Sequence, residues 1–237
     1  MGTTERRASG ALHAEVLDAL GEQIVGGDLS PGTVLTLEGV ARLHGVSVAM
    51  ARECVRVLES MGMVTSRRRV GITVRPRDQW HVFDPRVIRW RLAGRDRAAQ
   101  LVSLGELRSG FEPVAARLAA QRADAGQCAV LAAAVSDMTV LGRAGDLEAY
   151  LEADVRFHDT LLAASGNEML QALSGVVAEV LGGRTHHDLM PARPNPAAIA
   201  LHDDVARAVR AGDADAAEAA MRAIIDEAAS AVAETAD

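Results

Sequence analysis

The sequence predicts a mostly α-helical protein, with a small N-terminal domain that includes a β-hairpin and a C-terminal antiparallel all-helical bundle. The chain has 237 residues, only seven prolines and 3% aromatic residues, and its high alanine content favours helices over large β architectures. Hydrophobic residues make up 49% of the chain and recur at helical spacing in most segments. This content is sufficient for the core of one large or two small domains.

Positive charge is concentrated in the first 95 residues. Residues 1–95 carry 14 arginines and 10 acidic side chains, a net of +4, whereas 96–237 carry 11 arginines and 22 acidic side chains, a net of −11, and the sum is −7. The chain has no lysine, a bias that genomic composition explains, although the guanidinium group also suits phosphate and carboxylate. The asymmetry predicts polyanion contact in the first part and another role in the second.

The sequence gives no indication of secretion or membrane insertion. No uninterrupted apolar run approaches the roughly 18–20 residues of a membrane helix, and the first ten residues, MGTTERRASG, contain no apolar segment. The two cysteines, Cys54 and Cys128, are too few for a disulfide scaffold or a four-cysteine zinc site. We therefore expect a soluble, cytoplasmic protein with no membrane partner.

Residues 12–75 show the pattern of a helix-turn-helix followed by a β-hairpin. The apolar spacing predicts three helices, over 12–26, 37–44 and 48–62. Gly45 is placed to end the second helix and Ser47 to cap the third. After Gly62, the run MVTSRRRVGITV predicts a hairpin. Together these elements make a winged helix-turn-helix, which we expect to occupy residues 1–78.

Arginines fall on the two surfaces that a winged helix presents to double-stranded DNA. Arg52 and Arg56 share one face of helix 48–62, which such a fold places in the major groove. The hairpin tip reads Arg67, Arg68, Arg69, Val70 and Gly71. Arginines on a helix are more often a solvated face, but three at a hairpin tip favour contacts with phosphates or the minor groove.

The rest of the chain reads as helices. Asp84 and Pro85 mark the start of a connecting helix within residues 79–96. Breaks rich in Gly, Asp and Pro then separate six predicted helices, over about 97–122, 126–142, 146–164, 168–182, 197–211 and 214–234. We expect residues 97–237 to form one all-helical domain.

Polar side chains interrupt the apolar stripes of two bundle helices. Asp154 and His158 lie one turn apart on helix 146–164, and His202 takes an interior position on helix 197–211. Asp154 needs a partner, because burying an unpaired carboxylate is costly. A carboxylate with imidazoles is a common ligand set for first-row metals. The alternative is a buried Asp–His hydrogen bond or salt bridge without metal.

These segments resemble the GntR-type bacterial transcription regulators of the FadR subfamily. In the first part, GDLSPGTVL and GVSVAMARECVRVLESMGMV carry the resemblance. In the second part, LGELRSGFEPVAARLAAQRA, DVRFHDTLLAASGNEML and LHDDVARAVRAGDADAAEAAM carry it. The resemblance implies a homodimeric, ligand-responsive repressor that binds a pseudo-palindromic operator. It also implies that residues 97–237 are the effector-binding and dimerisation domain.

The resemblance also implies roles for residues of the first domain. Ser47 and Arg52 fall on positions that contact DNA in the family, and Arg67 to Gly71 fall in the wing. Val48 stands where the family usually has arginine, and Glu38 stands where the fatty-acid-responsive members have another. The operator sequence or affinity must then differ, because a lost Arg–guanine contact is worth roughly 1–3 kcal/mol.

Many members of the family bind a divalent metal through a D-x-x-x-H motif and two further histidines, and the metal helps to hold a small carboxylate. Asp154 and His158 match the motif and His202 matches the third ligand, but Ile224 stands where the fourth is expected. A site for a metal of the Zn, Ni or Mn type would be incomplete. Three ligands still suffice if water or an effector oxygen completes the sphere.

Arg108 matches an arginine that faces the effector cavity in the family. Its guanidinium would clamp the carboxylate of an organic acid, or it would form a salt bridge with Glu112 one turn away.

The segment FDPRVIRW resembles members that respond to sugar acids such as galactonate or gluconate. His186 and His187 could supply the missing metal ligand in principle, although a loop histidine pair is more often exposed.

Two other functions compete with this interpretation. One is a helical metalloenzyme in which Asp154, His158 and His202 hold a metal that activates water. No obvious general base or nucleophile accompanies that set, so we do not expect an enzyme. The other is a DNA-binding regulator whose ligand pocket has decayed, with Ile224 as a step in the loss.

Overall fold

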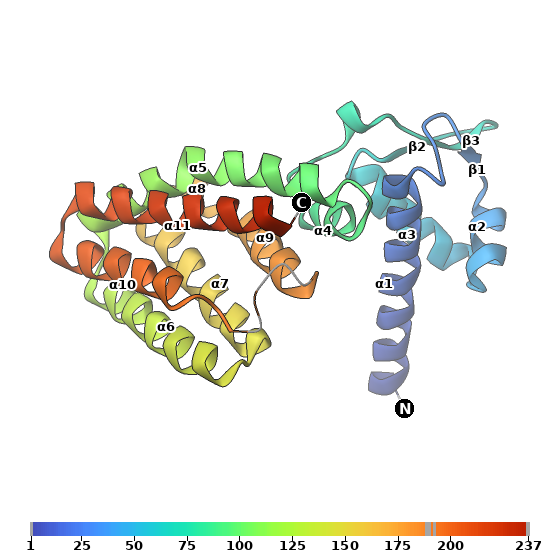
Figure 1. Ribbon diagram of the computed structural model, residues 1–237. Coiled ribbons are helices and arrows are strands. Elements are labelled where there is room, and N and C mark those ends of the chain that lie inside the picture. The colour runs from blue at the N-terminus through green and yellow to red at the C-terminus, as the bar shows by residue number, and fades with distance from the viewer. Residues whose placement is uncertain (1, 188–190, 192, 236–237) are drawn as a thin grey trace. The chain divides into compact units, whose positions relative to one another are not determined.

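The computed structural model describes residues 2–187, 191 and 193–235, and it divides into two compact units, Met1–Asp96 and Arg97–Asp237 (Figure 1). The first unit contains a helix-turn-helix with a small sheet, and the second is entirely helical in its described part. This arrangement confirms the predicted fold class.

The first unit has local structure that its capping residues explain. Its elements are α1 (Gly2–Gly26), β1 (Val34–Leu35), α2 (Leu37–His44), α3 (Val48–Ser60), β2 (Val64–Arg67), β3 (Gly71–Val74), the 3-10 helix η1 (Arg77–Gln79) and α4 (Pro85–Ala93). The side chains of Thr36 and Ser47 accept backbone N–H groups at the starts of α2 and α3, at 3.0 Å and 3.2 Å. Gly45, with φ 64°, ends α2. The turn between the two helices is thus fixed by residues within it.

The sheet has the strand order β1-β3-β2, and both pairs are antiparallel. The hairpin of β2 and β3 was predicted from the sequence, whereas β1 was not. A Cβ at Gly71, which has φ 110°, would lie 2.7 Å from the carbonyl oxygen of Leu35 in β1. Gly71 therefore has a structural reason for being glycine, because only a residue without a side chain lets β1 pass this close.

Trp90 ties α4 to α1 inside the first unit. Its side chain is 2% exposed, and its indole Nε1 donates a hydrogen bond to Asp18 Oδ1 at 2.9 Å. A Cβ at Gly21 would lie 2.5 Å from the indole ring, so the ring packs directly on the backbone of α1. Residues 79–96, which we expected to form a separate connector, accordingly belong to the first compact unit.

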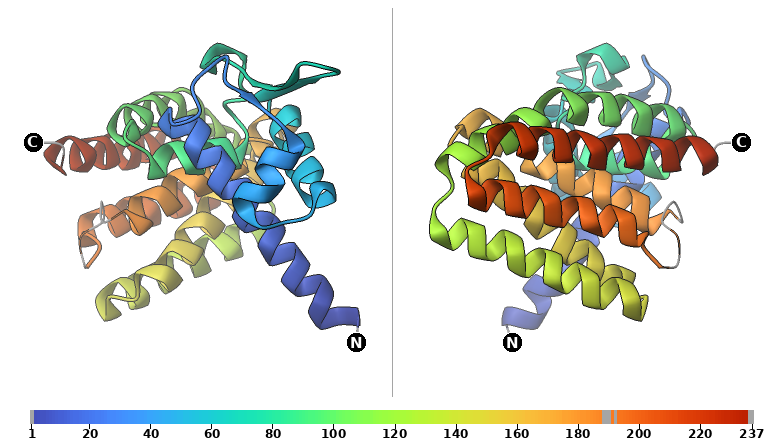
Figure 2. Two further views of the ribbon diagram at one scale, coloured as in Figure 1. Left: turned by 90° about the vertical axis from the view of Figure 1, so that its right-hand side faces the viewer. Right: turned by 60° about the vertical axis from the view of Figure 1, so that its left-hand side comes forward.

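The second unit is a bundle around α7. Its elements are α5 (Arg97–Arg122), α6 (Ala125–Ala144), α7 (Leu147–Ala164), α8 (Glu168–Gln171), α9 (Ser174–His186), α10 (Pro196–Ala211) and α11 (Ala214–Thr235). Helix α7 contacts α5, α6, α8 and α9, while α10 and α11 pack on each other and on α5. Figure 2 shows α5 and α11 side by side. The predicted helix over 168–182 is divided into α8 and α9.

One bundle helix has the length and composition of a membrane span. An 18-residue window of α6 has a mean hydropathy of 1.4, and 28% of it is buried. As the sequence indicated, α6 has no uninterrupted apolar run of that length. Its buried side chains, which include Leu131, Val135 and Met138, belong to the bundle, where α6 packs against α7 and α10.

Replacing Gly21 with alanine should destabilise the first unit by about 1–3 kcal/mol, because the added methyl group would overlap the Trp90 indole. Gly10→Ala, at an exposed position of α1 with open space around it, is the matched control and should stabilise by up to about 1 kcal/mol. Denaturant unfolding followed by tryptophan fluorescence measures both changes. Equal stability of the Gly21→Ala variant and the unsubstituted protein would contradict the packing described.

Candidate functional site

The arginines of α3 and of the hairpin line one groove of about 490 Å³ in the first unit. The predicted DNA-binding residues on this groove are Arg52, Arg56, Arg67, Arg68, Arg69 and Gly71. Ser47 acts as the cap of α3. Arg56 forms an exposed ion pair with Glu53 at 2.7 Å, whereas Arg52 is exposed with no ion pair among the described residues. Six of the seven residues predicted to bind DNA thus lie on one groove, and their contact with DNA stays a prediction.

Two glutamates shape the same groove. Glu59 Oε1 accepts a hydrogen bond from the backbone N–H of Ser66 at 2.7 Å, which joins α3 to β2. This bond sets the hairpin relative to α3. Glu38 also lines the groove, and its negative charge opposes a phosphate there.

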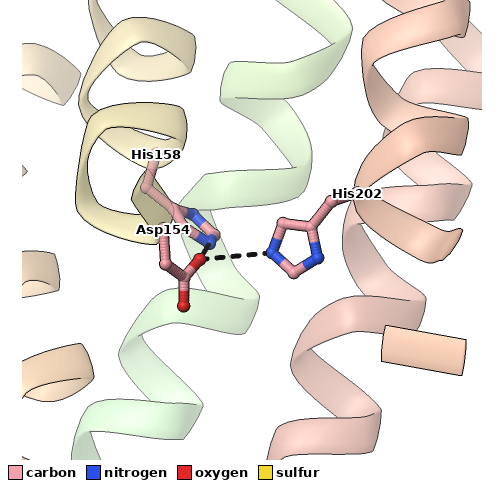
Figure 3. Close-up of side chains that lie close together, drawn as sticks. All are labelled: Asp154, His158 and His202. Atoms are coloured by element: carbon pink, nitrogen blue, oxygen red, sulfur yellow. Dashed lines mark ion pairs between the residues drawn. The ribbon is translucent and has the colours of Figure 1, made fainter. Parts of the chain in front are cut away.

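In the second unit, Asp154 and His158 on α7 meet His202 on α10 (Figure 3). Asp154 Oδ1 lies 3.5 Å from His158 Nε2 and 3.4 Å from His202 Nε2. The three residues are 8%, 1% and 4% exposed, as their interior positions in the apolar stripes predicted. One ligand atom from each residue lies within 4.8 Å of the other two.

The far side of each imidazole ring is held by a further contact. His202 Nδ1 lies 2.7 Å from the backbone oxygen of Ala198, which fits a ring that donates through Nδ1 and offers the lone pair of Nε2. His158 Nδ1 lies 2.7 Å from Glu112 Oε2, a close contact that is not aligned as a hydrogen bond. Carboxylates and carbonyls in these positions are typical outer partners of metal-binding histidines.

The three atoms at the centre fit a divalent metal. Asp154 Oδ1, His158 Nε2 and His202 Nε2 are buried and have no hydrogen-bond partner within the described part of the chain. Bonds of about 2.0–2.2 Å in a tetrahedral sphere place neighbouring ligand atoms about 3.3–3.6 Å apart, which agrees with the 3.4 Å and 3.5 Å separations. The chemistry of the donor set, and the separation of Asp154 Oδ1 from each imidazole, therefore fit a metal site with an open position.

The missing fourth ligand is not replaced by another histidine in this structure. Ile224 is 6% exposed and packs in the apolar core. His186 is exposed and lies 3.3 Å from Glu148 Oε1 through its Nε2, and His187 ends α9. Among the described residues, the group that could hold a metal consists of Asp154, His158 and His202.

A buried ion pair lies behind His158. Arg108 Nε lies 2.5 Å from Glu112 Oε1, and the two side chains are 3% and 0% exposed. The ion pair that we considered for Arg108 is therefore present. Arg108 also lines a cavity of about 240 Å³ between α5, α9 and α11, and its contact with an effector stays a prediction. The contact of Glu112 with His158 was missed, because nothing in the local sequence relates the two helices.

Both buried carboxylates stay ionised. Burial raises the pKa of Glu112, but the charge of Arg108 and the contact with His158 outweigh burial and lower it to about 2. Burial likewise raises the pKa of Asp154, and His202, His158 and Arg108 together lower it to about 2. An ionised Asp154 is the form that binds a cation.

Comparison with known proteins connects both units to one family. The model of the bacterial regulatory proteins of the gntR family matches residues 12–74, and the FCD domain model matches residues 103–227. The chain belongs to the GntR family of bacterial transcription regulators, with an FCD domain as its C-terminal part. Because GntR proteins are regulators, this assignment agrees with the expectation that the chain is not an enzyme.

Two curated relatives match this GntR regulator over most of their length. The galactonate operon transcriptional repressor of Escherichia coli (strain K12) is 32% identical over 89% of this chain and 92% of its own. A probable D-xylose utilization operon transcriptional repressor of Paenarthrobacter nicotinovorans is 26% identical over 92% of this chain and 88% of its own. The solved structure of E. coli McbR/YncC, with a TM-score of 0.57 and 18% identity, covers 95% of this chain and 99% of its own and shows the same fold.

The metal-free GntR regulator should lose stability in acid as Glu112 becomes protonated. Its lowered pKa contributes stability above the ordinary value of 4.5, and this contribution is lost as the pH falls from 4.5 towards about 2. Glu112→Gln should therefore cost about 3–5 kcal/mol at pH 7, since it leaves Arg108 buried without a counter-charge. The difference from the unsubstituted protein should shrink as the pH falls through this range.

Urea unfolding in the presence of a chelator, at pH values between 7 and 3, measures this difference. Glu106→Gln, at an exposed position of the same helix, should change stability by less than about 0.5 kcal/mol. A Glu112→Gln variant as stable as the Glu106→Gln control at pH 7 would show that the buried ion pair is not formed.

Proposed function

We propose that the chain is a homodimeric repressor that releases its operator when its FCD domain binds a small sugar acid through a divalent metal. The observation that carries this proposal is the convergence of three buried ligand atoms without partners, from Asp154, His158 and His202. Leaving these groups buried and unsatisfied is unfavourable, and a bound cation would satisfy all of them at once.

The groove of the first unit supports binding to double-stranded DNA. Its exposed arginines lie both on α3 and on the hairpin, so one duplex could be contacted in the major groove by α3 and along its backbone by the wing. Val48 and Glu38, which replace family arginines, would alter the operator sequence or the affinity rather than prevent binding. A dimer would place two such units on the half-sites of a pseudo-palindrome.

In the second unit, Asp154, His158 and His202 would hold a metal of the Zn, Ni or Mn type. A bound metal supplies a Lewis-acid centre for carboxylate and hydroxyl oxygens. With Ile224 in place of a fourth histidine, a larger part of the sphere stays open for such oxygens. The galactonate operon repressor among the relatives, together with the FDPRVIRW segment, supports a sugar acid as the ligand.

Regulation requires that the acid binds two arrangements of the dimer with different affinity. A ligand shifts an equilibrium only by its difference in affinity for the two states. The proposed effector favours an arrangement of the FCD domains in which the two DNA-binding units no longer fit both half-sites together.

A zinc titration tests directly whether Asp154, His158 and His202 bind a metal. Metal-free protein titrated with Zn²⁺ by isothermal calorimetry should bind about one ion per chain, and Asp154→Ala should weaken binding at least tenfold, because it removes the only anionic ligand of the set. Asp159→Ala, an exposed acid on the same helix, should bind like the unsubstituted protein. Ile224→His should tighten binding. Equal affinity of all four proteins would sink the metal assignment.

Operator binding tests the first unit. With an operator selected from random duplexes, Arg52→Ala should weaken binding by roughly 5–150-fold, the range for one lost arginine–base contact. Replacing Arg67, Arg68 and Arg69 with alanine should lower the slope of log affinity against log salt by about one for each lost phosphate contact. Arg210→Ala is the control for Arg52→Ala, because it also removes one positive charge, from an exposed position of α10.

Fluorescence anisotropy measures these affinities, first without and then with zinc and galactonate or gluconate. We expect the metal and acid together to reduce operator affinity of the unsubstituted protein. If no acid changes the affinity while zinc still binds, the chain is better described as a DNA-binding regulator with a decayed pocket.

A further inference from the structure

The tip of the hairpin holds an arginine in a backbone conformation that favours glycine. Arg69 has φ 70°, and within the described residues it is the one position with positive φ that is not glycine. It lies in the turn between β2 and β3, where the Val70 N–H donates a hydrogen bond to the Arg67 carbonyl oxygen at 3.1 Å. Because Arg68 does not share the positive φ, this is the geometry of a type II turn, whose third residue is usually glycine. Arg69 is therefore strained.

The fold itself does not use the Arg69 side chain. This side chain is exposed, and in the part of the chain that the structure describes it forms no hydrogen bond or ion pair. Glycine at this position would form the same turn without strain. Strain of this kind is commonly stored where a side chain serves function, so the guanidinium group of Arg69 has to be explained by what it contacts outside the protein.

The position of Arg69 across the DNA-binding groove indicates what this contact is. Arg52 and Arg56 line the groove from α3, and Arg69 lines it from the hairpin. In duplex DNA, one sugar–phosphate backbone separates the major groove from the neighbouring minor groove. With α3 in the major groove, as proposed, this backbone would lie in the protein groove, and the tip of the hairpin would lie beyond it at the minor groove.

The charges that line the groove suit a phosphate backbone. Five arginines and two glutamates, Glu38 and Glu59, line it, a net of +3. Glu53, which pairs with Arg56 at 2.7 Å, lowers this net to +2. The groove therefore remains positive after every carboxylate on or beside it that these contacts identify has been counted, and it can hold a chain of phosphates.

We infer that Arg69 inserts into the minor groove beside the segment contacted by α3, and that it selects A·T-rich sequence there. The minor groove is only about 6 Å wide, so a single side chain at the tip of a turn can enter it. A·T-rich segments have a narrower minor groove with a stronger negative potential, which attracts arginine. This inference rests on the proposed function and names a specificity-determining residue for it.

A base analogue that changes only the minor groove tests this inference. An operator is first selected from random duplexes with the unsubstituted full-length protein, and we expect A·T pairs beside the segment contacted by α3. Replacing adenine with 2,6-diaminopurine in these pairs adds an amino group in the minor groove and leaves the major-groove edge unchanged. Fluorescence anisotropy at one fixed salt concentration should show that this replacement weakens binding about fivefold or more.

Two glycine variants show which arginine reads the minor groove. Arg69→Gly should weaken binding to the unmodified operator about fivefold or more, and diaminopurine should then cost less than about twofold. Arg68→Gly removes the same charge at the neighbouring position of the turn. It should weaken binding to the modified and unmodified duplexes by the same factor, because a phosphate contact carries no sequence information directly.

The stability of the same variants separates DNA binding from a structural role. Arg69→Gly should raise the temperature at which the first unit unfolds by about 2–5 °C, because glycine adopts this φ without strain. Arg68→Gly should not raise it. The two tryptophans, Trp80 and Trp90, both lie in the first unit, so their fluorescence reports this transition. A more stable protein that binds its operator less tightly is the combined result that we expect for Arg69→Gly.

Three results would overturn the role of Arg69. These are a selected operator without A·T pairs beside the segment contacted by α3, a diaminopurine effect that is unchanged in Arg69→Gly, and an Arg69→Gly variant that is less stable than the unsubstituted protein. Failure of the proposed function would appear differently, as a selection in which the unsubstituted protein enriches no duplex.

Discussion

The buried carboxylate of Glu112 is the constraint on which the second unit depends. It is fully buried on α5, where its charge must be balanced from within the protein. Arg108 provides this balance from the same helix, and His158 contacts Glu112 from α7. Leaving a buried carboxylate without its partners is strongly unfavourable. These contacts therefore hold α7 in a fixed position against α5. The ring of His158 is consequently oriented with Nε2 towards Asp154.

The same contacts separate the side chains that maintain the fold from those available to a ligand. Glu112 is occupied by Arg108 and His158, and one nitrogen of His202 is occupied by a backbone oxygen. The buried atoms without a hydrogen-bond partner in the described part of the second unit include the three at the centre of the cluster, from Asp154, His158 and His202. In the first unit, Gly71 and Glu59 have a comparable role, since they fix the wing without being the charges that face DNA.

The sequence predicted elements whose determinants are local. The ends of α2 and the start of α3 were placed correctly because their caps lie within a few residues, and the interior positions of Asp154 and His202 followed from helical periodicity. Strand β1 was missed because a two-residue strand, Val34–Leu35, is defined by its pairing with β3 rather than by its own pattern. The contact of Glu112 with His158 was missed for the same reason, since it depends on how separate helices pack.

The coordination sphere of a bound zinc ion gives the most direct test of a metal site built from Asp154, His158 and His202. X-ray absorption at the zinc K edge, on full-length protein loaded with stoichiometric zinc, should show two imidazole ligands and oxygen ligands at about 2.0–2.2 Å. Addition of a bound sugar acid should change the oxygen ligands and leave both imidazoles in place. A sphere without imidazole, or with three or more imidazoles, would contradict a site built from Asp154, His158 and His202.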